Sequence, residues 1–174
     1  MKIKTLYDSS EVSARIKELG DKISAKHNDG KPILCVCVLR GAFMFFSELV
    51  KHIKGEVIVD FITLSSYEAT SSTGKINLIS GLRESIEDRH VLIIEDIIDS
   101  GRTIKFLREY FADKNALSVE VACLIDKPMT RQVEAAADYI AFTLTTPAFI
   151  VGYGLDYDQR FRNLDGIMEI DLEQ

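Results

Sequence analysis

Residues 91–103, VLIIEDIIDSGRT, combine the features of a buried strand with those of a ligand-binding turn. Four apolar residues lead to Glu95 and Asp96, and two isoleucines then lead to Asp99 and a Ser-Gly pair. Continuous apolar runs are typical of strands inside parallel sheets. Acidic side chains at the end of such a strand cost stability unless a cation or a hydrogen-bond donor meets them. The stretch therefore predicts a buried strand that ends at a binding site.

Strand and helix patterns alternate on both sides of this stretch. Apolar strand runs cover residues 32–39, 56–64 and 118–125, with a shorter one at 76–80, and helical patterns cover 9–29, 41–53 and 103–114. This alternation favours an α/β fold with a mostly parallel sheet, followed beyond Lys127 by a less regular part. In the second helix we expect one face to pack on the core, formed by Phe43, Phe46, Leu49, Val50 and Ile53. Asp8 and Glu11 resemble a capping box at the start of the first helix, and the third helix should turn Ile104, Leu107 and Phe111 inward.

Length, charge and cysteine content narrow the class of protein. A chain of 174 residues suits one globular domain, and a net charge of −6 argues against a general nucleic-acid binder. No apolar run approaches the roughly 18 residues of a membrane span, and we expect no secretion signal. Cys35, Cys37 and Cys123 lie in apolar strands and are expected to be reduced, buried thiols. We therefore expect a cytoplasmic protein without nucleic-acid or membrane partners.

The turn 99–103, DSGRT, offers several donors to a phosphate group. In open α/β sheets, ligands bind beyond the carboxyl ends of the strands, and this turn joins a strand to a helix there. Free N–H groups, the helix dipole and the Ser100 and Thr103 hydroxyls could hold a phosphate, although Asp99 and Ser100 could equally serve only as a helix cap. The chain contains no GxxxxGK[ST] motif and no complete dinucleotide fingerprint, so ATP and NAD are disfavoured.

The stretch VLIIEDIIDSGRT resembles the signature that binds phosphoribosyl pyrophosphate (PRPP) in type I phosphoribosyltransferases. Residues 38–49, 65–67 and 149–164 are similar to the pyrophosphate loop, the mobile lid and the purine pocket of the purine salvage members. The resemblance implies their fold, a central mostly parallel sheet flanked by helices, with a small irregular hood. It implies a single domain with a core at about 28–127 and a hood formed by the N-terminal segment and about 140–174.

The resemblance also implies an activity. The enzyme would transfer the 5-phosphoribosyl group from PRPP to N9 of a 6-oxopurine, hypoxanthine and also guanine, with Mg²⁺ as cofactor. The products would be IMP or GMP and pyrophosphate. The chain would form a homodimer or homotetramer.

Residues of the signature would receive the phosphoribosyl group. By resemblance, Glu95 and Asp96 would hold the ribose hydroxyls, directly or through Mg²⁺. Asp99 would lie near purine N7 as a general base or hydrogen-bond partner. The 5-phosphate would be bound by Ser100, Gly101, Arg102 and Thr103.

Other segments would supply the pyrophosphate site and the lid. By resemblance, Leu39, Arg40 and Gly41 would present backbone groups to pyrophosphate, with a cis peptide bond before Arg40. Arg162 would reach the same group. Closure of the lid by Ser66 and Tyr67 would exclude water.

The purine would bind between the strand that ends before Lys127 and the C-terminal segment. By resemblance, Lys127 would donate to the 6-oxo group, and Phe149 would stack on the ring. Ile150 would offer backbone groups to the purine edge, and Asp156 would ligate a second Mg²⁺.

Two other classes of protein compete with this interpretation. A receiver domain also opens with an acidic strand, but it needs a phosphoaccepting Asp at the end of a later strand. Here Asp126 and Lys127 come too early, and Asp138 precedes its strand. A PRPP-sensing regulator of the same fold would bind RNA or DNA and should show a basic face, which an acidic chain does not suggest.

Overall fold

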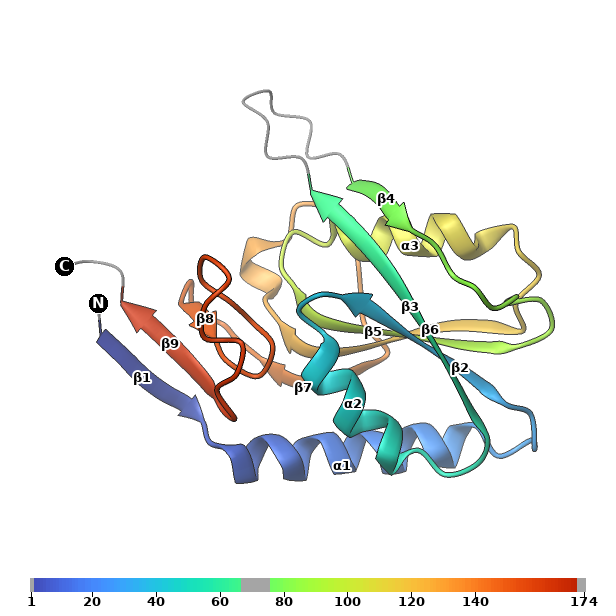
Figure 1. Cartoon of the computed structure of the whole chain (residues 1–174), viewed down its shortest axis with the longest axis horizontal. Coiled ribbons are helices and arrows are strands. Elements are labelled where there is room, and N and C mark those ends of the chain that lie inside the picture. Colours follow the sequence, from blue (N-terminus) through green and yellow to red (C-terminus); the bar gives the residue numbers. More distant parts are fainter. Residues whose placement is uncertain (1, 67–75, 172–174) are drawn as a thin grey trace.

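The computed structural model describes residues 2–66 and 76–171, and its centre is a six-stranded sheet (Figure 1). In spatial order the strands are β4 (Ile76–Ser80), β3 (Val57–Ser66), β2 (Ile33–Leu39), β5 (His90–Ile98), β6 (Ser118–Asp126) and β7 (Tyr139–Thr143). Neighbouring strands are parallel, except that β4 pairs antiparallel with β3. The predicted mostly parallel sheet is thus confirmed.

Helices cover both faces of this sheet, as the apolar strands require. One cluster of buried side chains joins α1 (Ser9–Lys26) and α2 (Phe43–His52) to one face, and a second joins α3 (Arg102–Ala112) to the other. Cys35 and Cys37 belong to the first cluster and Cys123 to the second. All three are buried free thiols, as predicted, and burial raises the pKa of the Cys35 thiol to about 12.

The first helix begins where the local pattern predicts, but the second turns a different side to the core. The Asp8 side chain accepts hydrogen bonds from the N–H groups of Ser10 and Glu11, and Glu11 completes a capping box. In α2 the buried side chains include Phe45, whereas Phe43 is 43% exposed, so the expected inward position of Phe43 is wrong. Two residues span about 200° around a helix, which places Phe43 opposite Phe45.

A smaller sheet contains β1 (Lys2–Tyr7), β9 (Ile167–Asp171) and β8 (Phe149–Val151), all antiparallel. It lies beside the start of α1, where the ring of Tyr7 stacks on Phe142 of β7 at a centroid distance of 4.0 Å. Strand β7 belongs to the large sheet, although its residues fall largely within the range expected for the hood. A short 3-10 helix, η1 (Pro128–Thr130), follows β6.

Parallel pairing brings the carboxyl ends of β2, β3, β5 and β6 to one edge of the large sheet. The loops that begin at Arg40, Asp99 and Lys127 therefore start close together, as the α/β pattern predicts. Within residues 2–66 and 76–171, no helix is both long and apolar enough to cross a membrane.

Candidate active site

The end of β5 and the turn before α3 line a cavity of about 210 Å³. Strand β5 continues past the two acids, since Glu95 pairs with Cys123 of β6 and Ile98 with Asp126. The predicted phosphoribosyl residues that line this cavity are Glu95, Asp96, Asp99, Ser100, Gly101 and Thr103. The structure therefore brings most of the predicted signature residues to one hollow at the sheet edge.

Glu95 and Asp96 are carboxyl groups in a poorly solvated position. Glu95 is only 5% exposed, and its Oε1 accepts from the N–H of Asp96 at 3.2 Å. Burial, and then the neighbouring charge of Asp96, raise the pKa of Glu95 well above its usual value. Burial also raises the pKa of Asp96, although its Oδ1 accepts from the N–H of Ile97 at 2.8 Å. A bound cation or a hydroxyl donor would stabilise the charged form of these two adjacent carboxyl groups.

Gly101 is required at the tip of the turn for two reasons. Its φ of +85° lies in the left-handed region that favours glycine. A Cβ atom at this position would lie only 2.9 Å from Ala135 Cβ and from Arg131 Cδ. The turn is thus pressed against the chain that follows η1.

The loop after β2 packs directly on Asp96. The peptide bond Leu39-Arg40 is cis, as predicted, and the side chain of Arg40 is exposed. A Cβ atom on Gly41 would lie 1.6 Å from Asp96 Oδ2, and one on Gly154 would lie 2.1 Å from the carbonyl oxygen of Gly41. Glycine at both positions therefore lets the loop after β2, strand β5 and the turn after β8 meet.

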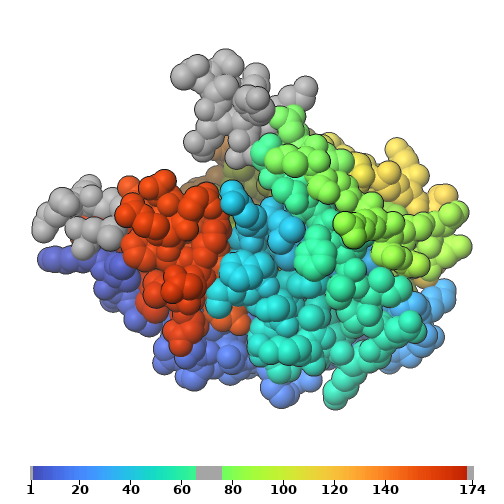
Figure 2. Space-filling model, in the orientation of Figure 1, coloured from blue at the N-terminus to red at the C-terminus, as the bar shows by residue number. Residues whose placement is uncertain are grey.

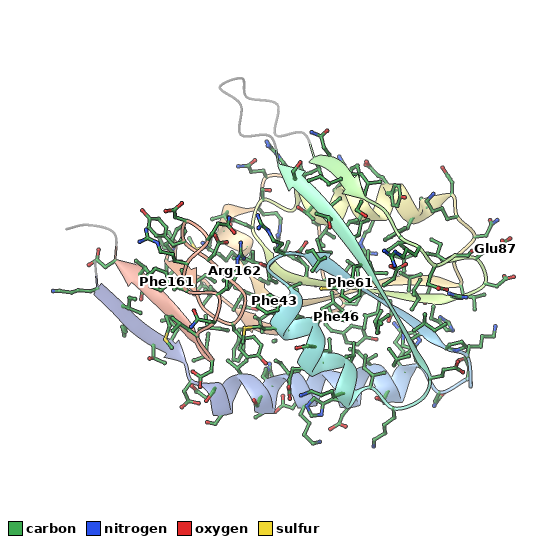
Figure 3. All side chains as sticks on the ribbon, in the orientation of Figure 1. Phe43, Phe46, Phe61, Glu87, Phe161 and Arg162 are labelled. Atoms are coloured by element: carbon green, nitrogen blue, oxygen red, sulfur yellow. The ribbon has the colours of Figure 1, made fainter. Side chains whose placement is uncertain are left out.

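Arg162 and Asp156 pair with each other beside these loops. Arg162 Nη2 lies 2.8 Å from Asp156 Oδ1, and Arg162 Nη1 donates to the carbonyl of Gly154 at 2.7 Å. The positive charge of Arg162 also counteracts the burial that raises the pKa of Asp96. Figure 3 shows Arg162 between the C-terminal loops and the start of α2. The predicted pyrophosphate-binding arginine thus lies at the same edge as the predicted ribose site.

Lys127 directly follows β6, next to the end of β5, and Phe149 begins β8. The backbone N–H of Lys127 donates to the carbonyl of Ile98 at 3.0 Å, and its buried Nζ donates to the carbonyl of Ala148 at 3.1 Å. The ring of Phe149 is 43% exposed. Ile150 is buried in β8, where it pairs with Glu169, so only its backbone could face a ligand. Ala148 and Phe149 help to line a second cavity of about 610 Å³, but Lys127 and Ile150 are not among its lining residues.

The lid prediction lies largely outside the described residues. Ser66 ends β3 and pairs with Ile76 of β4, and Tyr67 is not among the residues that the structure describes. Arg102 begins α3, and its N–H lies 3.4 Å from Ser100 Oγ.

Two further side chains at the site were missed in the sequence. Tyr157 packs the edge of its ring against Phe149, with centroids 5.5 Å apart and an interplanar angle of 88°. Arg131 donates to the carbonyl of Asp99. Tyr157 lies inside the stretch that resembles the purine pocket, so its position was a usable signal, whereas no local pattern distinguishes Arg131.

Comparison with known proteins identifies the family. The sequence model of the phosphoribosyl transferase domain matches residues 2–158. This chain belongs to the phosphoribosyltransferase family. Among curated relatives, the hypoxanthine-guanine phosphoribosyltransferases of Streptococcus thermophilus and Bacillus subtilis are 44% and 43% identical over 162 residues, 92% of this chain and 89% of each relative.

Solved structures of such phosphoribosyltransferases superpose on the whole chain. A hypoxanthine phosphoribosyltransferase from Staphylococcus aureus gives a TM-score of 0.91 at 38% identity, covering 97% of this chain and 91% of that one. A hypoxanthine-guanine phosphoribosyltransferase from Bacillus anthracis gives 0.91 at 37% identity, covering 98% and 100%. The predicted family and fold are confirmed, and the receiver-domain alternative is wrong.

Proposed function

We propose that this phosphoribosyltransferase transfers the 5-phosphoribosyl group of PRPP to N9 of a 6-oxopurine, hypoxanthine or guanine, and releases pyrophosphate. The observation that carries the proposal is the single hollow shared by Glu95, Asp96 and the turn before α3, with the loop of Gly41 packed on Asp96. Ribose hydroxyls, a 5-phosphate and a pyrophosphate group are the parts of PRPP that these three elements would bind. The names of the relatives support the choice of base.

In the reaction, the bond from the ribose anomeric carbon to pyrophosphate breaks as the bond to N9 forms. The anomeric carbon would carry positive charge in the transition state, as in glycoside chemistry. Asp99, at the start of the turn, would accept or steer the N7 proton of the base. Arg162 would stabilise the charge that develops on the departing pyrophosphate. Ser66 and Tyr67 would exclude water that could hydrolyse PRPP.

Magnesium fits Glu95 and Asp96 better than it fits Asp156. Two adjacent buried carboxylates are hard oxygen ligands, and Mg²⁺ is commonly held by one or two carboxylates with substrate phosphates. Across residues 2–66 and 76–171, no group of three or more acidic, His or Cys side chains could hold an ion, so the substrate would supply further ligands. Both Asp156 oxygens already have partners, Arg162 and the N–H of Gln159. Bound Mg²⁺ would neutralise charge on the pyrophosphate leaving group.

The base would bind between Lys127 and Phe149. The ammonium group of Lys127 is buried and donates only to a carbonyl, so a ligand that approaches it must offer an oxygen acceptor. A 6-oxo group does so, whereas the 6-amino group of adenine does not. The exposed ring of Phe149 would provide a stacking surface, held at its edge by Tyr157.

One assay tests the proposal directly. The purified protein is supplied with PRPP and Mg²⁺ and, separately, with hypoxanthine, guanine, xanthine and adenine, and formation of nucleotide and pyrophosphate is measured. We expect turnover with hypoxanthine and guanine and at least about a hundredfold lower kcat/KM with adenine, because an unpaired buried donor is costly. Absence of turnover with all four bases, together with salt-dependent binding to RNA or DNA, would instead favour the PRPP-sensing regulator.

We further infer that the protein is a cytoplasmic homodimer or homotetramer. Three apolar side chains, Phe43 of α2 and Val59 and Phe61 of β3, are 43–48% exposed. Figure 3 shows Phe43, Phe46 and Phe61 near one another, and Figure 2 shows, in the same orientation, the surface that α2 and β3 form together. An apolar surface of this kind favours contact with a second copy. We also infer a single domain, with a core at about 28–127 and a hood formed by the N-terminal segment and about 140–174.

A further inference from the structure

The turn before α3, residues 99–103, is called the phosphate turn below. Three successive carbonyl groups, from the last residue of β5 into this turn, accept hydrogen bonds from one segment, residues 127–133. The carbonyls belong to Ile98, Asp99 and Ser100. The donors are Lys127 N at 3.0 Å, Arg131 Nη1 at 3.1 Å, and Gln132 N and Val133 N, both to Ser100, at 3.0 and 3.2 Å. Residues 127–133 therefore hold the outer side of the chain from Ile98 to Ser100 by hydrogen bonds.

This pairing determines where the N–H groups of the turn point. In a trans peptide the N–H of the next residue points away from the carbonyl, and the only cis bond among the described residues is Leu39-Arg40. The N–H groups of Asp99, Ser100 and Gly101 are therefore directed away from the 127–133 segment. The cavity lies on that opposite side, since none of its lining residues belongs to the segment. Successive N–H groups directed into a hollow at a helix N-terminus form an anion-binding site.

The central contact depends on a side chain rather than on backbone. Arg131 donates one arm of its guanidinium to the carbonyl of Asp99 and pairs the other with the carboxylate of Asp126, at the end of β6. The Arg131 and Asp126 side chains are only 18% and 14% exposed. A planar guanidinium held at two points has little freedom. It therefore fixes the orientation of the peptide between Asp99 and Ser100.

We propose that Arg131 is a positioning residue that orients the Asp99–Ser100 peptide for binding of the 5-phosphate. The proposal deepens the proposed function and rests on it. Arg131 touches no predicted substrate group; it acts through the turn. The same segment begins with Lys127, so residues 127–133 both carry the predicted purine-binding lysine and hold the phosphate turn.

The test compares a ligand that carries the phosphate with one that lacks it. Dissociation constants for IMP and for inosine are measured by calorimetry on wild-type protein, Arg131→Gln and Arg131→Lys, together with kcat and KM for PRPP. We expect Arg131→Gln to weaken IMP binding about tenfold, which corresponds to about 1.4 kcal/mol. Inosine binding should change little, so the ratio of the two affinities falls. KM for PRPP should rise, and Arg131→Lys should restore part of the ratio.

Arg108→Gln is the matched control. Arg108 also donates to backbone carbonyls, those of Val119 and Ala136, and pairs with a carboxylate, Asp138, but none of these partners belongs to the turn 99–103. Its loss should lower the melting temperature without changing the ratio of IMP to inosine affinity. If Arg131 had a merely structural role, Arg131→Gln would weaken the binding of IMP and of inosine equally. An unchanged ratio of the two affinities in this variant would overturn the proposal.

Two outcomes separate this proposal from the proposed function. If wild-type protein shows no turnover and no preference for IMP over inosine, the proposed function is wrong and Arg131 has no phosphate to serve. If wild-type protein shows both, only the variants decide the role of Arg131. Should Arg131→Gln not fold, Asp126→Asn removes the ion pair but keeps the Asp99 contact. It should shift the ratio in the same direction by a smaller factor, and an unchanged ratio there would count against the proposal.

Discussion

Asp99 is the acid whose position depends most on the turn around it. Glu95 and Asp96 are held within β5, whereas Asp99 is the first residue after the strand. Its carbonyl is bound by Arg131, and its side chain lines the same cavity as the two strand acids. A carboxylate placed between a ribose site and a phosphate site is well situated to meet the base as it joins the anomeric carbon.

At this residue we predict the effect of Asp99→Asn. The amide keeps the size of the side chain but cannot accept a proton, so kcat with hypoxanthine should fall about 10²- to 10⁴-fold. KM for PRPP should change little, because Ser100, Gly101 and Thr103 remain. Steady-state kinetics measure both constants. Asp113→Asn, at the far end of α3, is the control and should behave as wild type. Unchanged turnover in Asp99→Asn would remove this residue from the mechanism.

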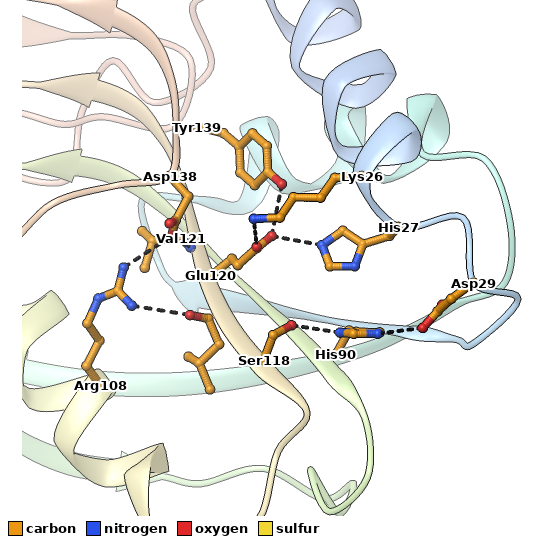
Figure 4. A network of polar contacts seen from close by, with 11 residues as sticks. Lys26, His27, Asp29, His90, Arg108, Ser118, Glu120, Val121, Asp138 and Tyr139 are labelled. Atoms are coloured by element: carbon orange, nitrogen blue, oxygen red, sulfur yellow. Dashed lines mark hydrogen bonds and ion pairs between the residues drawn. The ribbon is translucent and has the colours of Figure 1, made fainter.

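At the scale of elements, buried acids lie near both ends of the adjacent strands β5 and β6, but the acids at the two ends differ in their hydrogen-bond partners. At the carboxyl ends, Glu95 and Asp96 form no hydrogen bond or ion pair with a basic side chain of residues 2–66 and 76–171, and burial raises the pKa of both. At the other ends, Glu120 of β6 is also buried but has three donors. Figure 4 shows this network, in which Glu120 is bound by Lys26, by His27 Nε2 at 2.8 Å and by the Tyr139 hydroxyl at 2.9 Å.

Glu120 contributes to the stability of the fold, whereas Glu95 and Asp96 belong to the predicted site. Glu120 joins the end of α1 to β6 and β7, and it has no part in the predicted site. Burial alone would raise its pKa, but hydrogen bonds from Lys26, His27 and Tyr139 hold the pKa of Glu120 below its usual value. A carboxylate whose pKa is lower in the folded than in the unfolded state stabilises the fold above its unfolded pKa. That stabilisation is lost as the pH falls through the folded-state pKa.

We therefore predict a pH-dependent effect of Glu120→Gln. At pH 7 the variant should lose about 2 kcal/mol of folding free energy, because it loses the charge-assisted contact with Lys26, and should melt about 4–8 °C lower than wild type. The difference should narrow as the pH is lowered from about 5 toward 3, where wild-type Glu120 becomes protonated as well. Thermal unfolding followed by circular dichroism measures this. Glu109→Gln, at an exposed position of α3, is the control. A difference in melting temperature independent of pH would contradict the assignment.

At the scale of the whole molecule, the main question is what covers the face around Phe61. The ring of Phe61 is 45% exposed although it contacts Phe46, with centroids 5.5 Å apart. This surface adjoins the loop after β2, since Leu39 and Phe61 line the same cavity. A partner subunit here would therefore lie next to the predicted pyrophosphate loop.

Phe61→Lys tests the proposed oligomer. A charged side chain in an apolar contact between subunits would lose its hydration, so the variant should dissociate toward a monomer of 19.6 kDa. Size-exclusion chromatography with light scattering measures the mass of both proteins. Leu117→Lys replaces another exposed apolar residue, 42% exposed before β6, and should leave the mass unchanged. A wild-type monomer, or an oligomer that Phe61→Lys does not alter, would show that this face is not the interface.

Features that depend on neighbours along the chain were predictable from the sequence. The capping box of α1, the buried face of α3 and the apolar run of β5 each arise from interactions within a few residues, and all three are confirmed. The turn before α3 belongs to the same class, because the left-handed conformation of Gly101 is a local requirement. The resemblance of residues 91–103 rests on such local features, and it therefore identified the family.

Features that depend on distant segments were decided only by the tertiary structure. Strand β1 forms because it pairs with β9, more than 160 residues later, and its own sequence predicted no strand. Phe43 is exposed because Phe45 and Leu49 turn the helix the other way toward the core. Arg131 donates to the carbonyl of Asp99, 32 positions earlier in the chain, and Arg162 forms an ion pair with Asp156 because the loop between them folds back. By itself the sequence determined the family, the parallel sheet and the acids of the site, because these follow from local pattern. The hydrogen bonds that direct the N–H groups of the phosphate turn come from a separate segment, and only its packing against that turn decides them.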